Sequence, residues 1–390
     1  MNPAKAYNAA MHHRSHRMSL RRRILSVFRG ETPDVVPFML DLSHWLPHKL
    51  RLPFDLSRSY EEPIRELVEY HKRNGVGFYL SSLTGFCSVE YSNDVTAETI
   101  RETSGGKTRI RWKFATSLGE IERVRTWDEQ TYSWHVTKWG VESQEDLRVL
   151  THALSARRFG FKREVYRAWR DAVGDTGVVY VGAGYSAIGH LMNYWMGVER
   201  AILASVDWPD VFAETVERIN ANTLELVNAL VESPAEVIVM GDNISSDIQP
   251  PRFFAKWSAP FYTEAARRLH TAGKHLMIHI DGRLRGALRM VRETSADGGD
   301  AITPTPLGDL TPEQCREEAG PDFLLSGGVS PELWLPNAAL GDFEDAVLRW
   351  LALRRCSPRL IAAAGDQVPP GADEDRIGVM RDLVERHGRY

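Results

Sequence analysis

The chain has 390 residues, and its 52 acidic and 48 basic side chains leave a formal net charge of -4 at neutral pH. No long basic block occurs beyond the first thirty positions, which argues against a nucleic acid as partner. The scattered cysteines, Cys87, Cys315 and Cys356, exclude a disulfide framework and a CxxC metal site. Because no apolar run reaches the roughly 18 residues that span a bilayer, we expect a cytoplasmic protein that is not in the membrane.

The amino-terminal segment, residues 1–18, has little apolar content and no periodicity, which predicts a disordered tail. A metal-binding arm is the alternative for its histidines, His12, His13 and His16. A helix is predicted to begin after Ser19, a good N-cap residue, and to end at Gly30.

Eight short runs of apolar, β-branched or aromatic residues, bounded by turn residues, predict strands. They are Val35 to Leu40, Val76 to Leu80, Val178 to Val181, Val237 to Met240, His275 to Ile278, Asp300 to Thr303, Phe323 to Ser326 and Leu360 to Ala364. A helical pattern follows most of them, and strands that alternate with helices form parallel sheets. The sequence therefore predicts an α/β fold, a single (β/α)8 TIM-type barrel over residues 19–390.

The long interval between the second and third predicted strands indicates an insertion at about residues 86–150. Within it, residues 107–127 alternate in polarity around a turn at Gly119, which predicts a β-hairpin that shapes the mouth of a binding site. For Trp127, Trp134 and Trp139 two interpretations stay open, a small satellite core and direct contact with a substrate.

The second half of the chain shows more regular helical patterns. Pro at the start and Gly at the end of residues 251–273 favour one helix there, because Pro is tolerated in a first turn and Gly ends a helix. Further helices are predicted at residues 284–294, 312–318, 343–354 and 373–385.

Polar residues and two glycines stand at or just after the predicted strand ends, where a parallel barrel builds its active site. They are Asp41, Ser81, Tyr185, Asp242, Asn243, His279, Asp281, Gly327, Gly328 and Asp366. His279 and Asp281 are two residues apart, so in a strand both side chains would point to the same side.

One imidazole and several carboxylates from three strand ends can bind a divalent metal, or serve as general acid and base. The alternative for any one aspartate is a helix N-cap that follows a strand. Gly327 and Gly328 would let an anionic ligand approach the backbone, and a tight turn is an equal alternative for them.

Several separated motifs resemble the uroporphyrinogen decarboxylase superfamily in the right order. They are residues 20–25, 30–37, the helix before Gly273, the strand that ends at His279, Gly298-Gly299-Asp300, residues 325–329 and residues 365–370. The resemblance implies a (β/α)8 barrel with its pocket at the carboxyl-terminal strand ends and, in many members, a homodimer.

The chain departs from genuine uroporphyrinogen decarboxylases after the first two strands. No arginine follows the first strand until Arg51, and the second is followed by Ser81-Ser82-Leu83 in place of an aspartate. The chain is more similar to the branch with corrinoid-dependent methyltransferases, which hold zinc with a His-x-Cys pair and a later Gly-Cys. Here His279 is kept, while Asp281 and Asp366 stand where that branch has cysteines, so the resemblance implies these three as metal ligands.

The leading hypothesis is a metal-assisted enzyme that transfers a methyl or other one-carbon group on a small organic substrate. The metal would be a divalent ion such as zinc, and a corrinoid would come only on a separate protein. Asp242, His279 and Asp281 would be catalytic. The predicted substrate contacts are Asp41, His44, Tyr185, Asn243, Arg283, Gly327 and Gly328.

Two other hypotheses stay open. One is a cofactor-free decarboxylase, in which His279 and the aspartates manage protons and Arg283 or Arg285 holds a carboxylate. The other is a noncatalytic barrel used for binding or assembly, which predicts no bound metal and tolerance of His279→Ala.

Overall fold

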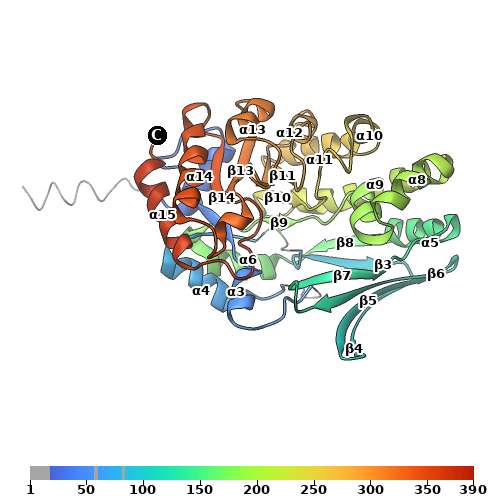
Figure 1. Ribbon diagram of the computed structural model, residues 1–390. Coiled ribbons are helices and arrows are strands. Elements are labelled where there is room, and N and C mark those ends of the chain that lie inside the picture. Colours follow the sequence, from blue (N-terminus) through green and yellow to red (C-terminus); the bar gives the residue numbers. More distant parts are fainter. Residues whose placement is uncertain (1–17, 57–59, 81–83) are drawn as a thin grey trace, which may run out of the picture.

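A computed structural model describes residues 18–56, 60–80 and 84–390 of the chain. Residues 1–17 of the predicted tail, which include its histidines, and Ser81 lie outside the described residues. Parallel strands form the centre of the molecule (Figure 1). They are β1 (Met39–Asp41), β2 (Gly77–Tyr79), β9 (Val181–Gly182), β10 (Val237–Met240), β11 (His275–His279), β12 (Gly298–Ile302), β13 (Leu324–Val329) and β14 (Leu360–Ala364).

Two isolated bridges close these strands into a ring. Strands β9 to β14 form one continuous parallel sheet, and β1 pairs with β2 in parallel. Phe38 bridges to Ala362 of β14, and Phe78 of β2 bridges to Gly177, just before β9. The predicted (β/α)8 barrel is confirmed, with a strand near each of the eight predicted runs.

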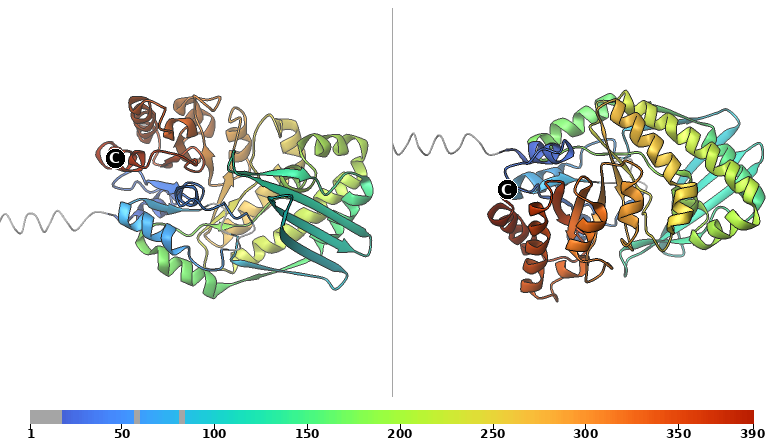
Figure 2. Two further views of the ribbon diagram at one scale, coloured as in Figure 1. Left: turned by 60° about the horizontal axis from the view of Figure 1, so that its bottom comes forward. Right: turned by 90° about the horizontal axis from the view of Figure 1, so that it is seen from above.

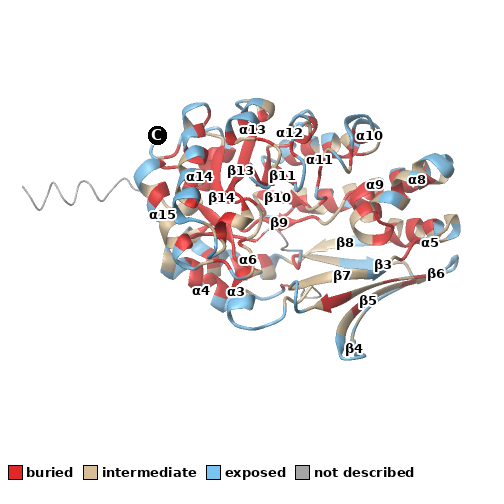
Figure 3. Cartoon of the chain, viewed as in Figure 1, coloured by how far each residue is buried: buried red, intermediate tan, exposed pale blue. Residues whose placement is uncertain are grey.

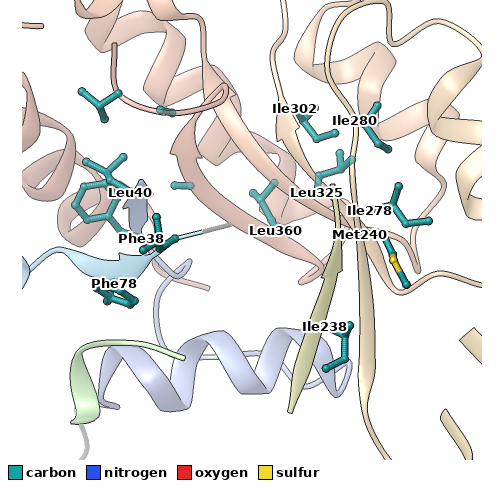
Figure 4. Close-up of a cluster of buried hydrophobic side chains, with 14 of the residues drawn as sticks. Phe38, Leu40, Phe78, Ile238, Met240, Ile278, Ile280, Ile302, Leu325 and Leu360 are labelled. Atoms are coloured by element: carbon teal, nitrogen blue, oxygen red, sulfur yellow. The ribbon is translucent and has the colours of Figure 1, made fainter. Parts of the chain in front are cut away.

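Side-chain alternation along the strands produces two separate apolar cores. One set of residues, which includes Phe38, Ile238 and Ile278, belongs to the large cluster under the surrounding helices (Figure 4). The neighbouring residues, such as Val239 and Met277, belong to a second cluster that also contains residues of α2 (Leu20–Phe28). Alternate residues of each strand therefore point into the barrel. The same alternation decides which side chains at the strand ends point inward.

The barrel helices follow the predicted pattern with shifted ends. Ser19 caps α2 by accepting a hydrogen bond from the backbone N–H of Arg22 at 3.3 Å. Around the strands lie α3 (Trp45–Lys49), α4 (Arg65–Asn74), α6 (Arg163–Val173), α9 (Pro209–Val231), α12 (Ala287–Arg292), α13 (Pro312–Ala319), α14 (Leu340–Ala352) and α15 (Asp375–His387). None of the described helices is both long and apolar enough to cross a bilayer.

The single helix predicted at residues 251–273 is wrong, because two helices occupy this segment. They are α10 (Pro251–Trp257) and α11 (Ala259–Thr271), which meet at Ser258. Pro260 has no backbone N–H to continue the helix, so α10 ends and a new helix begins around it. At this junction between the two helices, the Ser258 hydroxyl donates a hydrogen bond to the side-chain oxygen of Gln249 at 2.6 Å.

An added antiparallel sheet extends from one side of the barrel (Figures 1 and 2). Its strands, in spatial order, are β4 (Val95–Ser104), β5 (Lys107–Thr116), β6 (Gly119–Asp128) and β7 (Ser133–Lys138). The predicted hairpin is confirmed as β5 and β6, with Thr116 opposite Gly119. Strand β4 is much more exposed than the barrel strands (Figure 3), so its pattern gave little apolar signal.

Two smaller pieces connect this sheet to the barrel. Strands β3 (Cys87–Tyr91) and β8 (Arg157–Phe161) pair with each other, and α5 (Gln144–Ser155) packs along β5 and β6. A third apolar cluster joins Phe114 of the sheet to Trp195, whose rings stack at 5.1 Å. Trp195 ends a π-helical turn, residues 190–195, that lies between the short α7 (Ala187–Gly189) and α8 (Val198–Asp207).

Candidate active site

A cavity of about 510 Å³ opens where the carboxyl ends of the barrel strands face the added sheet. Its volume is typical of sites for small molecules. The barrel contributes polar residues to it, and the added sheet contributes Arg125, Ser133 and Trp134. The other lining residues are His44, Phe54, Asp55, Leu56, Tyr60, Thr84, Gly182, Gly184, Tyr185, Tyr194, Val239, Gly241, Asn243, His279, Asp281, Asp366 and Gln367.

His279, the last residue of β11, lies between the barrel interior and this cavity. It follows Met277 by two residues, so the alternation that buries Met277 inside the barrel turns His279 inward as well. Its Nδ1 lies 3.2 Å from Oδ2 of Asp300 on β12, the residue opposite it in the sheet register. The Tyr79 hydroxyl on β2 donates to the same carboxylate oxygen. The buried Asp300 therefore fixes the orientation of the His279 ring.

Asp366 follows β14 and reaches the cavity from the other side of His279. Its Oδ1 lies 4.0 Å from His279 Nε2, and 37% of its side chain stays exposed. Gly365 makes this approach possible, because a Cβ at that position would lie 2.3 Å from Thr303 Oγ1. Asp281 is more exposed and lines the same cavity beyond the end of β11.

The charges of these groups are coupled. Burial opposes a charged His279, yet the carboxylates of Asp300, Asp366 and Asp281 together raise its pKa to about 10. Burial would raise the pKa of Asp300, but the His279 cation and the Tyr79 hydroxyl hold it below its usual value. Burial and the neighbouring carboxylates raise the pKa of Asp366 to about 7, although the His279 cation opposes this change. At neutral pH the cavity thus presents a cationic imidazole beside a carboxyl group close to its midpoint.

The structure brings six of the predicted residues to the cavity, namely His44, Tyr185, Asn243, His279, Asp281 and Asp366. The His44 ring stacks on Phe54 with centroids 3.9 Å apart. Burial lowers the pKa of His44 to about 4, so this ring is neutral at pH 7. Asn243 has a left-handed backbone, φ 49°, which is rare outside glycine and is often found at functional sites.

Two predicted aspartates are buried beside the cavity and do not line it. Asp41 accepts a hydrogen bond from the backbone N–H of Ser43 at 2.8 Å. Asp242 accepts from the backbone N–H of Ser186 at 2.9 and 3.1 Å, and from the Tyr262 hydroxyl. Its carboxylate thereby anchors the start of α7, and burial raises its pKa. Asp242 is placed as a structural anchor of the segment that carries Tyr185.

The other predicted substrate contacts also lie away from the cavity lining. The exposed Arg283 does not line it. Gly327 and Gly328 lie inside the buried strand β13. A Cβ would come within 2.2 Å of the Ile302 carbonyl at Gly327 and within 2.4 Å of the Trp350 ring at Gly328. These glycines allow close packing of β13 in the barrel wall.

Sequence reasoning did not assign a role to Asp300, Tyr79 or Arg125. Asp300 stood at the predicted start of the sixth strand, whereas the strand begins two residues earlier at Gly298, which places Asp300 opposite His279. Alignment of the sixth predicted strand beside the fifth could have shown that Asp300 lies next to His279. For Arg125 no local signal existed, because its position over the barrel depends on how the added sheet docks.

The donors near His279 fit a metal ion only in part. Its Nδ1 is held by a buried carboxylate, as metal-binding histidines commonly are, and Nε2 faces Asp366. Among the described residues, however, no group of three or more His, Cys, Asp or Glu side chains is placed to share one metal ion. The predicted ligand set of His279, Asp281 and Asp366 is therefore not assembled in this geometry.

The fold and the cavity define a (β/α)8 barrel with an ionisable cluster at the carboxyl ends of its strands. The sequence model of the uroporphyrinogen decarboxylase family matches residues 135–387. This match covers more than half of the chain, so the protein belongs to the uroporphyrinogen decarboxylase family. The matched residues include β9 to β14 with His279, Asp300 and Asp366, and leave out β1, β2 and most of the added sheet.

Curated relatives agree with this assignment, and a solved structure agrees with the fold. Uroporphyrinogen decarboxylases of Trichlorobacter lovleyi and Pelobacter propionicus are 24% and 25% identical over 215 and 218 residues, which is 55% and 56% of this chain. The alignments span 59% and 60% of those proteins. A methyltransferase from Methanosarcina mazei superposes with a TM-score of 0.60 at 14% identity, over 95% of this chain and 99% of that chain. This last similarity supports the fold alone.

Proposed function

We propose that this protein is an acid–base enzyme that removes a carboxyl group from a small organic acid bound in the cavity. The observation that carries the proposal is the arrangement of Asp366 and His279, which face each other at 4.0 Å in the cavity, with His279 anchored by the buried Asp300. The family name and the decarboxylases among its relatives support this reaction class.

In the proposed step, the bond between a substrate carbon and its carboxylate breaks, and the electron pair stays on the carbon as CO2 leaves. The carboxyl group of Asp366 donates a proton to that carbon and regains one from water. The His279 cation stabilises negative charge on the reacting part of the substrate, and Asp300 keeps the imidazolium in place. A carboxyl group with a pKa of about 7 suits this role, because it can both give and regain a proton at neutral pH.

The dependence of the rate on pH tests the role of Asp366. Because the protonated form acts, we expect kcat to fall as the pH rises through about 7. We expect Asp366→Asn to lose at least about 100-fold in kcat, since an amide cannot donate this proton. The assay is CO2 release from a panel of aromatic and heteroaromatic carboxylic acids.

Asp247→Asn is the matched control, because Asp247 is exposed after β10 and does not line the cavity. It should keep the rate and pH profile of the wild type. An Asp366→Asn variant that folds, as judged by circular dichroism, and decarboxylates at the wild-type rate would refute the assignment.

A second candidate is metal-assisted transfer of a methyl or other one-carbon group, with a corrinoid supplied by a separate protein. The observation that favours it is the anchored Nδ1 of His279, which leaves Nε2 directed toward Asp366. A divalent ion there would supply Lewis-acid chemistry.

Elemental analysis distinguishes the two candidates. On the acid–base proposal we expect purified wild type to hold far less than one metal ion per chain, and to keep none after addition of zinc and dialysis. His279→Ala, Asp366→Ala and the control His275→Ala, at the opposite end of β11, should not differ from it. Stoichiometric metal that is lost only from the first two variants would favour the second candidate.

A further inference from the structure

The added sheet places a guanidinium group in the wall of the cavity. Arg125 on β6 lines it, although the residue belongs to a strand outside the barrel. One Nη donates to the backbone carbonyl of Asn193 at 3.3 Å, and the guanidinium lies 5.9 Å from the Tyr194 ring. Its Nε is buried and has no hydrogen-bond partner among the described residues.

The other charged groups near the cavity have charged partners or are acidic themselves. His279 faces Asp300, and Asp55 forms an ion pair with Arg101 at 2.7 Å. Arg125 has no carboxylate within ion-pair distance in the described part of the chain. A partly buried guanidinium with unused donors is costly, and a carboxylate that binds it through two hydrogen bonds would offset that cost.

A second arginine strengthens the positive charge at this end of the cavity. Arg123 precedes Arg125 by two residues on β6, so both side chains lie on the same face of the sheet. It is fully buried, donates to the Tyr194 carbonyl at 2.7 Å, and its guanidinium lies 3.3 Å from the centroid of the Tyr194 ring. Burial and the neighbouring Arg125 lower the pKa of Arg123 to about 9, so it is still charged at pH 7.

Aromatic side chains also line part of this cavity. Trp134 of β7 contacts Trp127, with ring centroids 5.4 Å apart. The ring centroids of Tyr185 and Tyr194 lie 5.8 Å apart. Of these four residues, Trp134, Tyr185 and Tyr194 line the cavity, and Phe54 and Tyr60 line it as well. Flat rings bind such walls well by stacking and edge contacts.

We propose that Arg125 binds an anionic group of the substrate that does not react, and that the substrate is an aromatic acid with two carboxylates. This inference rests on the proposed function, because the carbon that loses its carboxylate would lie at Asp366, which protonates it. An arginine bound to the leaving carboxylate would stabilise the ground state, so a second carboxylate is the better partner for it.

Binding of simple aromatic acids tests this proposal without turnover. The probes are benzene-1,3-dicarboxylate, its monoamide and the saturated cyclohexane-1,3-dicarboxylate, measured by isothermal titration calorimetry at low ionic strength. We expect wild type to bind the aromatic diacid about tenfold more tightly than the monoamide and than the saturated diacid. In Arg125→Gln, the preference for the diacid over the monoamide should fall to about one.

Arg111→Gln is the matched control on the neighbouring strand β5. Arg111 is opposite Val124, so it lies on the other face of the sheet, where it pairs with Glu102 and Glu122. This variant should keep the wild-type preference. A diacid preference that survives in Arg125→Gln, or no binding of any probe by wild type up to about 10 mM, would overturn the inference.

The Asp366→Asn variant separates this inference from the proposed function. We expect it to keep the diacid preference and to lose decarboxylation. Continued decarboxylation by Asp366→Asn would refute the role of Asp366 and leave the Arg125 contact standing. The contact with Arg125 would be refuted if His279→Gln lost the diacid preference while Arg125→Gln kept it. The carboxylate that does not react would then be bound at His279.

Discussion

His279 connects the stability of the barrel to the chemistry of its cavity. Its imidazole is anchored by a carboxylate on the adjacent strand, and that carboxylate is bonded in turn to Tyr79 across the barrel. Only 12% of the His279 side chain and 2% of the Asp300 side chain are exposed. Because a buried charge without its partner is costly, loss of either member should affect the fold as well as the reaction.

The raised pKa of His279 predicts how stability depends on pH. An unfolded histidine has a pKa of about 6.5, and the folded value is about 10. The folded protein therefore holds this proton more tightly, so the stabilisation is complete below about pH 6.5 and is lost as the pH rises toward 10. We expect the free energy of unfolding to fall over this window by on the order of 2 kcal/mol more in wild type than in His279→Gln.

Urea unfolding at about pH 6, 8 and 10 measures this difference. His275→Gln is the control, because His275 pairs with Asp297 at the opposite end of the same strand. It should show the same loss between pH 6.5 and 10 as wild type. Parallel stability curves for wild type and His279→Gln would contradict a cationic His279.

At the scale of single elements, the barrel wall depends on positions that admit no side chain. Strand β13 passes Trp350 of α14 so closely that only glycine fits at position 328. Gly328 also has φ +123°, a backbone conformation that other residues rarely adopt. The two glycines of this strand are therefore explained by packing, and the predicted contact with a ligand is not needed to account for them.

A substitution at this position should be severe. Gly328→Ala would place a Cβ about where the buried Trp350 ring lies, and we expect a loss of about 3 kcal/mol in the free energy of unfolding from overpacking and backbone strain. Chemical denaturation monitored by circular dichroism measures the loss.

Gly341→Ala is the matched control, since Gly341 lies in the helix α14 and, outside its neighbours in that helix, no atom of the described residues would come within 4 Å of its Cβ. It should change stability by less than about 1 kcal/mol. Equal effects of the two alanines would show that the contact with Trp350 is relieved at little cost.

At the scale of the whole molecule, the cavity belongs to two parts of the fold. The barrel supplies the ionisable cluster, and the added sheet supplies Arg125 and Trp134. The stacked rings of Phe114 and Trp195 hold the sheet against the barrel, and Arg123 donates to the same π-helical segment. The match to the family begins at residue 135, after these residues of the sheet. In the proposed function, the added sheet takes part in binding the substrate through Arg125.

Much of the fold could be predicted because its signals are local. The strand runs, the cap at Ser19 and the hairpin at Gly119 each depend on residues a few positions apart. The break at Ser258 was missed although Pro260 marked it, because the amphipathic pattern continues through both helices. Exposed strands such as β4 have no buried face, so the hydrophobic pattern could not identify them.

The candidate site was predicted only in part, for a related reason. The sequence by itself determined that His279, Asp281 and Asp366 stand at strand ends, since a parallel barrel brings such ends to one face. Only the tertiary structure decided that Asp300 holds His279 and that Arg125 reaches the cavity. Tyr79 and Asp300 are 221 residues apart, and their contact depends on strand register and barrel closure. Local sequence patterns fix which element a residue occupies, whereas such distant contacts are fixed by how the elements pack.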